Sequence, residues 1–414
     1  MIEVKASTTR GAVYFAGESV RCEIVFTNVG DQDTDESMEL NSLDHAKDIN
    51  KGRTSHIERL AWASAQIHCQ CTLNSLRVVR PVKSMDRITE NSNHELVSDS
   101  STSFTVSKGE HGHCILSTQP KILFCDLELA PGESKTFLYT ETIPSEGPPS
   151  YRGQAVKYSY KLTLGTSRVQ SQIRLIRLPL RILVVQGLSE IQHLVEYKEQ
   201  PSNPFLEKQT LETSLLDIGV DFLNAVTSRR NSYIYSIVSE RGTVGKFCLF
   251  KSAYRIGEEI VGSFDFDDSL ISCLKYTVTL QSEEHIPEEC QTGSSKTSPV
   301  TYSSYGSVQE SCLHTKKSHL ILPVSITVCP EFVSDLVCLK WRLHFEFVLA
   351  SSSLPAGASP LQCTYPQLDT AMWQAPSDID TELMTWDLPI KLVATNPVLA
   401  SSVSMLKTSN SIYI

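Results

Sequence analysis

The sequence predicts an all-β protein that contains two β-sandwich domains in tandem with one helix between them. Three observations support this prediction. A short pattern at residues 14–26 recurs at 254–266, many short runs alternate apolar with polar residues, and a single stretch at about 210–228 has helical spacing. Many alternating strands with little helix are typical of sandwiches, in which each of two sheets buries one face.

The repeated pattern carries most of this prediction. Four residues recur at a constant offset: Tyr14, Gly17, Glu18 and Phe26 are matched by Tyr254, Gly257, Glu258 and Phe266. Apolar residues then follow at every second position, which places them on one face of a strand, and the Gly-Glu pair suits the turn that enters it. Two β sequences can share such patterning by chance, but the penultimate and closing strands also repeat in the same order, which favours a duplication.

Composition narrows the class of protein. With 414 residues the chain is long enough for two domains that each bury a core. Its net charge of −10 argues against nucleic-acid binding and against direct docking on anionic lipid. No stretch reaches the length of a membrane span, and strand-like sequence from Ile2 leaves no room for a signal peptide. Twelve scattered cysteines without a Cys-X-X-Cys motif predict reduced thiols in the cytosol.

The first domain is expected to span residues 1–186. Strands are predicted at 2–6, 14–26, 61–71, 114–129, 134–143, 155–165 and 175–186. A long acidic insertion at about 30–59 and a polar loop at 84–112 interrupt them. The closing strand contains Pro179, which has no N–H for a sheet ladder and therefore belongs at a strand start or on an edge strand.

A linker at 187–231 carries the one predicted helix, at about 210–228. Its apolar residues recur every three or four positions: Leu211, Leu215, Ile218, Phe222 and Val226. This spacing is typical of an amphipathic helix, although Gly219 weakens the prediction. We expect the apolar face to pack between the two domains rather than to bind a helix of a partner.

The second domain is expected at 232–395. Strands are predicted at 246–266, 274–280, 319–328, 337–348 and 386–392, with a polar loop at 283–307. The closing strand contains Pro389 where the first domain has Pro179. Residues 396–414 are polar and are expected to form a flexible tail.

The sequence contains no motif of catalysis or cofactor binding. A phosphate-binding loop, His-Glu-X-X-His and Gly-X-Ser-X-Gly are all missing. Cys69 and Cys71 beside His68 could suggest a metal site, but no second pair completes a tetrahedron, so two buried thiols on one strand face are the better interpretation. We therefore expect no catalytic, cofactor-binding or metal-binding residues.

The other candidates also have plain structural interpretations. His111, His113 and Cys114 form a loose cluster, which we interpret as loop histidines beside a strand thiol. Four more histidines are scattered along the second half: His285, His314, His319 and His344. Because His344 stands on the charged face of its strand, we expect it to be solvated or to contact a neighbouring strand.

Residues 148–151, Pro-Pro-Ser-Tyr, match the Pro-Pro-X-Tyr pattern of ligands for WW domains. They lie between two predicted strands, where the chain must turn back toward Val156. A structural turn is therefore favoured over an exposed ligand.

Several stretches resemble a known family, the Rgp-type subunit of the Ric–Rgp complex. They are residues 60–68, 114–118 with 121–126, 310–315, 340–347 and 386–391. Residues 137–164 are also similar to the amino-terminal domain of the arrestin fold. The resemblance implies two tandem arrestin-like sandwiches, and it lapses in the acidic insertion, the linker and the loop at 283–307.

The same resemblance implies a non-catalytic partner subunit of a guanine-nucleotide exchange factor for a Golgi Rab GTPase of the Rab-six type. A larger Ric-type subunit would bind this chain. The pair would act in retrograde endosome-to-Golgi transport, in the cytosol and peripherally on the Golgi membrane. Exchange factors bind the nucleotide-free GTPase more tightly than the loaded one, which needs complementary surfaces and not a general base.

Two alternatives remain open. The first is a stand-alone arrestin-like adaptor that links membrane cargo to trafficking machinery. Such adaptors often carry Pro-Pro-X-Tyr in an exposed tail, and residues 396–414 contain none. The second is an enzyme, which an activity lost on replacing one residue would support.

Overall fold

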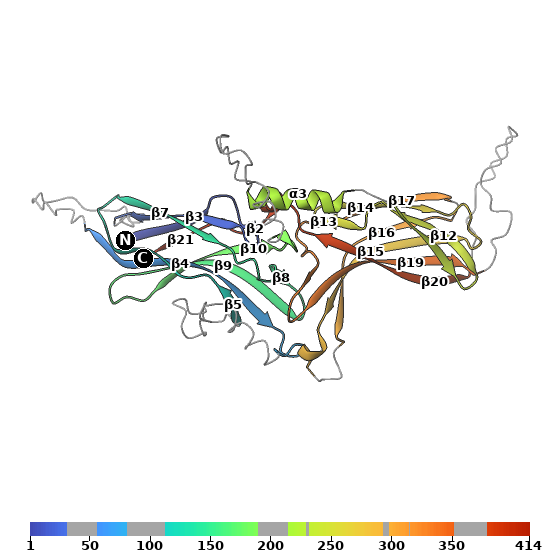
Figure 1. The fold of residues 1–414 in the computed structure, drawn as a ribbon, viewed down its shortest axis with the longest axis horizontal. Coiled ribbons are helices and arrows are strands. Elements are labelled where there is room, and N and C mark those ends of the chain that lie inside the picture. The colour runs from blue at the N-terminus through green and yellow to red at the C-terminus, as the bar shows by residue number, and fades with distance from the viewer. Residues whose placement is uncertain are drawn as a thin grey trace, which may run out of the picture.

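The computed structural model is an elongated, mostly β molecule in which two pairs of sheets follow one another along the long axis (Figure 1). It describes residues 1–30, 56–80, 112–188, 214–228, 232–292, 298–313, 315–351 and 379–414. The prediction of an all-β fold is confirmed. Most of the acidic insertion and of the linker lies outside the described residues.

The first sandwich, as we call the sheets nearer the N-terminus, pairs a four-stranded sheet with a seven-stranded one. The smaller sheet has the order β21-β1-β3-β7, in which β21 is Ser409–Tyr413, and the larger has β2-β10-β9-β4-β5 with β6 beside β4 and β8 beside β9. The strands are β1 (Ile2–Thr8), β2 (Val13–Phe15), β3 (Ser19–Asn28), β4 (Glu58–Leu73), β5 (His113–Ser117), β6 (Lys121–Leu129), β7 (Ser134–Thr142), β8 (Tyr151–Arg152), β9 (Val156–Ser167) and β10 (Arg174–Leu183).

The second sandwich pairs the sheet β11-β12-β14-β17 with the sheet β13-β20-β19-β15-β16, in which β18 lies beside β19. Its elements are β11 (Tyr233–Ser239), β12 (Gly242–Leu249), β13 (Ala253–Arg255), β14 (Glu259–Asp265), β15 (Cys273–His285), the 3-10 helix η1 (Glu288–Cys290), β16 (Val300–Ser311), β17 (Lys317–Pro323), β18 (Phe332–Val333), β19 (Cys338–Ala350) and β20 (Thr381–Val393). Buried alternate residues of these strands fill the space between its sheets.

The repeat found in the sequence is a repeat in space. β2 pairs in parallel with the closing strand β10, and β13 pairs in parallel with the closing strand β20. Gly17 and Gly257 both have positive φ, +86° and +89°, a conformation that favours glycine. The glutamate after each glycine accepts a bond from a main-chain N–H three residues earlier, at 2.9 Å for Glu18 and 3.1 Å for Glu258.

The two closing prolines occupy equivalent places inside their strands. Pro179 pairs with Lys161 of β9, and Pro389 pairs with Arg342 of β19. The short strands β2 and β13 pair only with residues 181–183 and 391–393, so each ladder is one-sided at its proline. Of the two places expected for such a proline, a strand start or an edge, the structure shows a local edge of the sheet.

The inter-domain helix is α3 (Leu215–Thr227), capped by Ser214, whose side chain accepts a bond from the N–H of Asp217. It lies across the junction of the two sandwiches (Figure 1). Its buried face includes Ile218 and Leu223, and it packs on Phe15 of the first sandwich and on β13 of the second. The predicted packing between the domains is confirmed; residues 210–213 lie outside the described range.

The expected flexible tail is wrong. Residues 396–414 form α4 (Pro397–Val403) and β21 (Ser409–Tyr413), and β21 pairs antiparallel with β1. Asn396 caps α4, and Pro397 and Ala400 of this helix are buried. Ile412 packs on the first core, and β21 takes the ladder that β1 would otherwise expose. The polar composition hid these contacts because only alternate residues of β21 face inward.

The expected polar loop at 283–307 is wrong at both ends, because only residues 286–299 lie between the strands β15 and β16. β15 continues to His285, and β16 begins at Val300 and pairs along β15. The inward positions at the end of β15 are Ser282 and Glu284, both buried, so hydrophobic alternation stops before the strand does. In the described part of the chain, no helix has the length and apolarity that crossing a bilayer requires.

Candidate functional site

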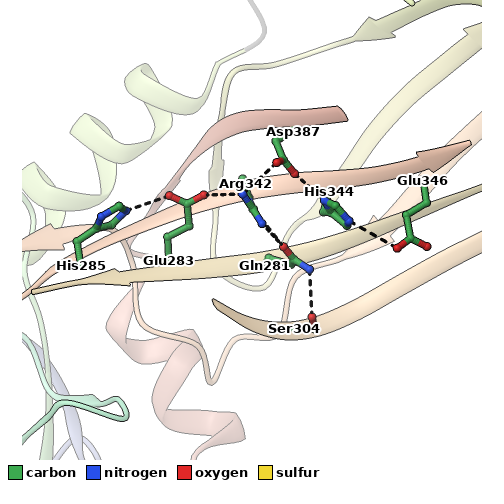
Figure 2. Close-up of polar contacts among 8 residues, drawn as sticks. All are labelled: Gln281, Glu283, His285, Ser304, Arg342, His344, Glu346 and Asp387. Atoms are coloured by element: carbon green, nitrogen blue, oxygen red, sulfur yellow. Dashed lines mark hydrogen bonds and ion pairs between the residues drawn. The ribbon is translucent and has the colours of Figure 1, made fainter. Parts of the chain in front are cut away.

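The outer face of the β15, β16, β19 and β20 sheet carries a connected set of polar side chains, which we call the polar network (Figure 2). Alternate residues of each strand point away from the core, so polar residues from neighbouring strands meet on this face. Its members are Gln281, Glu283, His285, Ser304, Arg342, His344, Glu346 and Asp387.

Arg342 lies at the centre of the polar network. Its Nη1 is 3.0 Å from an oxygen of Asp387 and 3.2 Å from one of Glu283. Its Nε and Nη2 both donate to Oε1 of Gln281, at 3.0 and 2.9 Å. The guanidinium also lies 4.1 Å from the ring centroid of Tyr302 on β16, a cation–π contact. Four neighbours on three strands thus hold one side chain in place.

Two histidines extend the polar network in opposite directions (Figure 2). His344 Nδ1 is 2.6 Å from Asp387 Oδ1, and its Nε2 is 3.6 Å from Glu346. His285 Nε2 is 3.0 Å from Glu283 Oε2. His344 pairs directly with Asp387 between β19 and β20, so the expected cross-strand contact is confirmed. His319 lies on β17 in the other sheet, and His314 lies outside the described residues.

The electrostatics suit recognition more than stabilisation. The Arg342 side chain is 16% exposed, whereas that of Asp387 is 45% exposed, so solvent screens the outer ion pairs. Exposed pairs of this kind contribute about 0.2–1 kcal/mol each. Holding an Arg beside a Tyr at a surface lowers the entropy that a binding partner must remove, and these residue types dominate interface hot spots.

The cysteine cluster of the first sandwich is buried. Cys69 and Cys71 are both inward residues of β4, as expected for two thiols on one face. Burial raises the pKa of Cys71 to about 11 and that of Cys69 further. His113 is exposed on β5, Cys114 is partly buried, and His111 lies outside the described residues. Among described residues, no three His, Cys, Asp or Glu side chains are grouped as metal ligands.

The Pro-Pro-Ser-Tyr segment is a structural turn, as predicted. The carbonyl of Pro148 accepts a 2.7 Å bond from the hydroxyl of Tyr160. Ser150 exchanges main-chain and side-chain bonds with Ile182 of β10, and Tyr151 is buried on β8. These contacts tie the segment to two strands of the first sandwich.

Several members of the polar network could not be identified from the sequence. Glu283, His285 and Ser304 fall in the segment interpreted as a loop. A usable signal was the alternation of Gln281, Glu283 and His285, which continues the outward face of β15 beyond the last apolar inward residue. This signal was concealed because the inward residues of the same segment, Ser282 and Glu284, are polar as well.

Two sandwiches of mostly antiparallel strands place the molecule among the all-β proteins. The family model described as Rgp1 matches residues 37–193 and 186–350. The chain belongs to the Rgp1 family.

Two curated relatives span nearly the full chain. The human protein named RAB6A-GEF complex partner protein 2 is 41% identical over 407 residues, which cover 97% of this chain and 97% of the relative. The bovine protein of the same name is 40% identical over 406 residues, which cover 97% of this chain and 96% of the relative.

Proposed function

We propose that this chain is the partner subunit of a guanine-nucleotide exchange factor for a Rab GTPase of the Rab-six type. The observation that carries this proposal is the near-complete match to two relatives named as partner proteins of a RAB6A exchange-factor complex. A match that covers both sandwiches supports the transfer of a role that depends on the whole molecule.

The role we propose is to bind other proteins, without catalysing the making or breaking of a covalent bond. A larger Ric-type subunit holds this chain, and the pair binds the nucleotide-free GTPase more tightly than the loaded form, so the nucleotide is released. The site of action is the cytosolic face of the Golgi, in retrograde transport from endosomes, with the chain attached to the membrane through the complex. The family resemblance supports this location.

The polar network is our candidate for the surface that meets the larger subunit. Arg342 is held by Glu283, Asp387, Gln281 and Tyr302, so the guanidinium is already positioned when a partner arrives. The network holds three carboxylates, those of Glu283, Glu346 and Asp387, and one guanidinium, so a cationic side chain of a partner beside the exposed Asp387 would form a charge-assisted bond at low entropic cost.

The experiment combines purification with nucleotide release. The chain is purified from cells with and without the larger subunit, and release of labelled nucleotide from the Rab is followed. We expect the pair to be recovered together and to accelerate release. A chain that has no large partner, with no release by the purified fraction, refutes the proposal and favours the stand-alone adaptor.

Point variants test the surface. Arg342→Ala should weaken assembly by tenfold or more, about 1.4 kcal/mol, because it empties the centre of the polar network. The matched control is Lys161→Ala, the corresponding residue of β9 in the first sandwich, which contacts Gln70. Equal affinity of the Arg342 variant and the wild type would exclude this face.

A further inference from the structure

The two sandwiches share their cores. Phe332 and Leu336 belong to the second sandwich by sequence, yet they are buried in the apolar cluster of the first. Phe15 and Leu183 of the first sandwich are buried in the cluster of the second. The aromatic rings of Tyr151 and Phe332 meet across this boundary, with centroids 5.0 Å apart. The junction is therefore an apolar interface and not a loose contact.

One buried carboxylate crosses the interface from the second sandwich. Glu284 of β15 is 4% exposed. Its Oε2 accepts bonds from the main-chain N–H groups of Gln154 and Ala155, at 3.0 and 3.1 Å. The hydroxyl of Tyr151 also bonds to this carboxylate. A Cβ at Gly153 would overlap both Glu284 and Tyr151, so the turn between β8 and β9 closes around the carboxylate.

One cation crosses the interface in the other direction. Arg181 of β10 is partly buried, and its Nη2 donates to the carbonyls of Ile326 and Val328, both at 2.9 Å. These carbonyls belong to the segment between β17 and β18 of the second sandwich. Burial lowers the pKa of Arg181 from its usual value.

The two contacts form a reciprocal arrangement. Each sandwich inserts one charged side chain into main-chain groups of the other, and within the described residues neither charge forms an ion pair. Main-chain N–H and C=O groups have fixed positions, so they define the location of the charged group more tightly than two flexible side chains would. A buried charge that loses such partners is strongly destabilised, which disfavours any other angle between the sandwiches.

We propose that Glu284 and Arg181 are positioning residues that lock the two sandwiches at one angle, and that the larger subunit recognises this locked arrangement. The second half of the statement rests on the proposed function. The first half concerns the chain alone and is tested without a partner.

The test compares Glu284→Gln, Arg181→Met and the double variant with the wild type. The matched control is Arg21→Met with Glu23→Gln, two exposed residues of β3. Small-angle scattering measures the shape of the isolated chain, and hydrogen exchange measures the amides of residues 151–158. Circular dichroism establishes that each variant keeps its strands.

We expect the scattering of the double variant to show a wider range of molecular shapes than that of the wild type. Exchange at residues 154 and 155 should rise by about tenfold, because each amide loses a charged acceptor. Each single variant should widen the distribution of shapes less than the double variant, and Glu284→Gln alone should already raise exchange at 154 and 155, so the result does not depend on the double variant being well folded. Wild-type scattering and exchange in folded variants would overturn the lock.

The affinity of each variant for the larger subunit tests recognition of the locked arrangement separately from the lock itself. A loosened variant that binds with lower affinity supports recognition of the locked arrangement. A loosened variant that binds as the wild type overturns that part and leaves the lock standing. If no larger subunit is found with the chain, the proposed function is refuted. Scattering and exchange of the isolated chain still test whether Glu284 and Arg181 hold the two sandwiches at one angle.

Discussion

At the scale of single residues, the structure explains why a glycine, Gly219, stands inside the helix α3. A glycine inside a helix costs about 0.5–1 kcal/mol relative to alanine, and so it weakened the helix prediction. In the structure, a Cβ at this position would lie 2.9 Å from Cε2 of Phe15, which is fully buried. Glycine is required because the helix approaches β2 too closely for a side chain.

Gly219→Ala should therefore destabilise the protein despite the better helix propensity. Overpacking against a buried ring costs about 1–3 kcal/mol, more than the gain in propensity. Urea unfolding of the purified chain measures the change. The double variant with Phe15→Leu should lose less stability than the two single changes added together. A more stable Gly219→Ala protein would contradict the close approach.

The glutamate of the second repeat makes a prediction about pH. Burial alone would raise the pKa of Glu258, but bonds from the main chain and side chain of Arg255 and from Lys251 outweigh it and hold the pKa below its usual value. A depressed pKa in the folded state stabilises the protein above the unfolded-state pKa, about 4.3, and this contribution disappears as the pH falls through the folded-state pKa.

Glu258→Gln should therefore lower the free energy of unfolding at pH 7, and its difference from the wild type should shrink below about pH 4, the range in which the carboxyl is protonated. Chemical unfolding at several pH values measures this difference. The exposed Glu259→Gln serves as the neighbouring control. A difference that stays constant down to pH 3 would show that the carboxylate charge plays no part.

At the scale of elements, strands with one apolar face were predictable and strands at edges or junctions were not. Apolar and polar residues alternate along most of β9 and β19, because each strand lies between two other strands and turns one face toward the core. β16 lies at the edge of its sheet and β21 adds to the edge of another, so few of their side chains are buried and their sequences look polar. Only the arrangement of the whole sheet explains them.

The strand β21 gives a test at this scale. Ile412 pairs with Val4 and packs on the first core. Ile412→Asp should destabilise the first sandwich by about 1–2 kcal/mol, because a carboxylate replaces a partly buried apolar side chain. Ser411→Asp, which points to solvent on the same strand, should change stability by less than about 0.5 kcal/mol. Equal effects of the two changes, measured by thermal unfolding, would contradict the packing of β21.

At the scale of the whole molecule, the duplication was visible in the sequence and the junction was not. The repeated pattern occupies one short segment in each copy, beginning at Tyr14 and at Tyr254, so it can be found by comparing the two segments of sequence. Glu284 and Arg181 meet main-chain groups far away in the chain, and no side-chain pattern records a main-chain partner. The polar network was recognisable only from His344 and its strand, because the buried polar residues Ser282 and Glu284 concealed the end of β15.

The shared cores predict how separated halves behave. We propose domain boundaries at 1–186 and 232–395, but each half would expose apolar residues that the other buries, such as Phe15 or Phe332. The halves are produced as residues 1–228 and 229–414, which keep α3 and β21. Each half produced alone should bind a hydrophobic dye and aggregate, whereas the two produced together should yield a soluble complex. Sedimentation and dye fluorescence measure this. Two soluble, monomeric halves would show that the shared core contributes little.

The pairing of β21 with β1 has a consequence for synthesis on the ribosome. β21 is synthesised long after β1, yet it completes the sheet that contains β1. Domains usually fold in order from the N-terminus as they emerge. The sheet of β1 therefore has an unpaired edge on the nascent chain until β21 has been synthesised, and an unpaired edge is a site at which chaperones can bind.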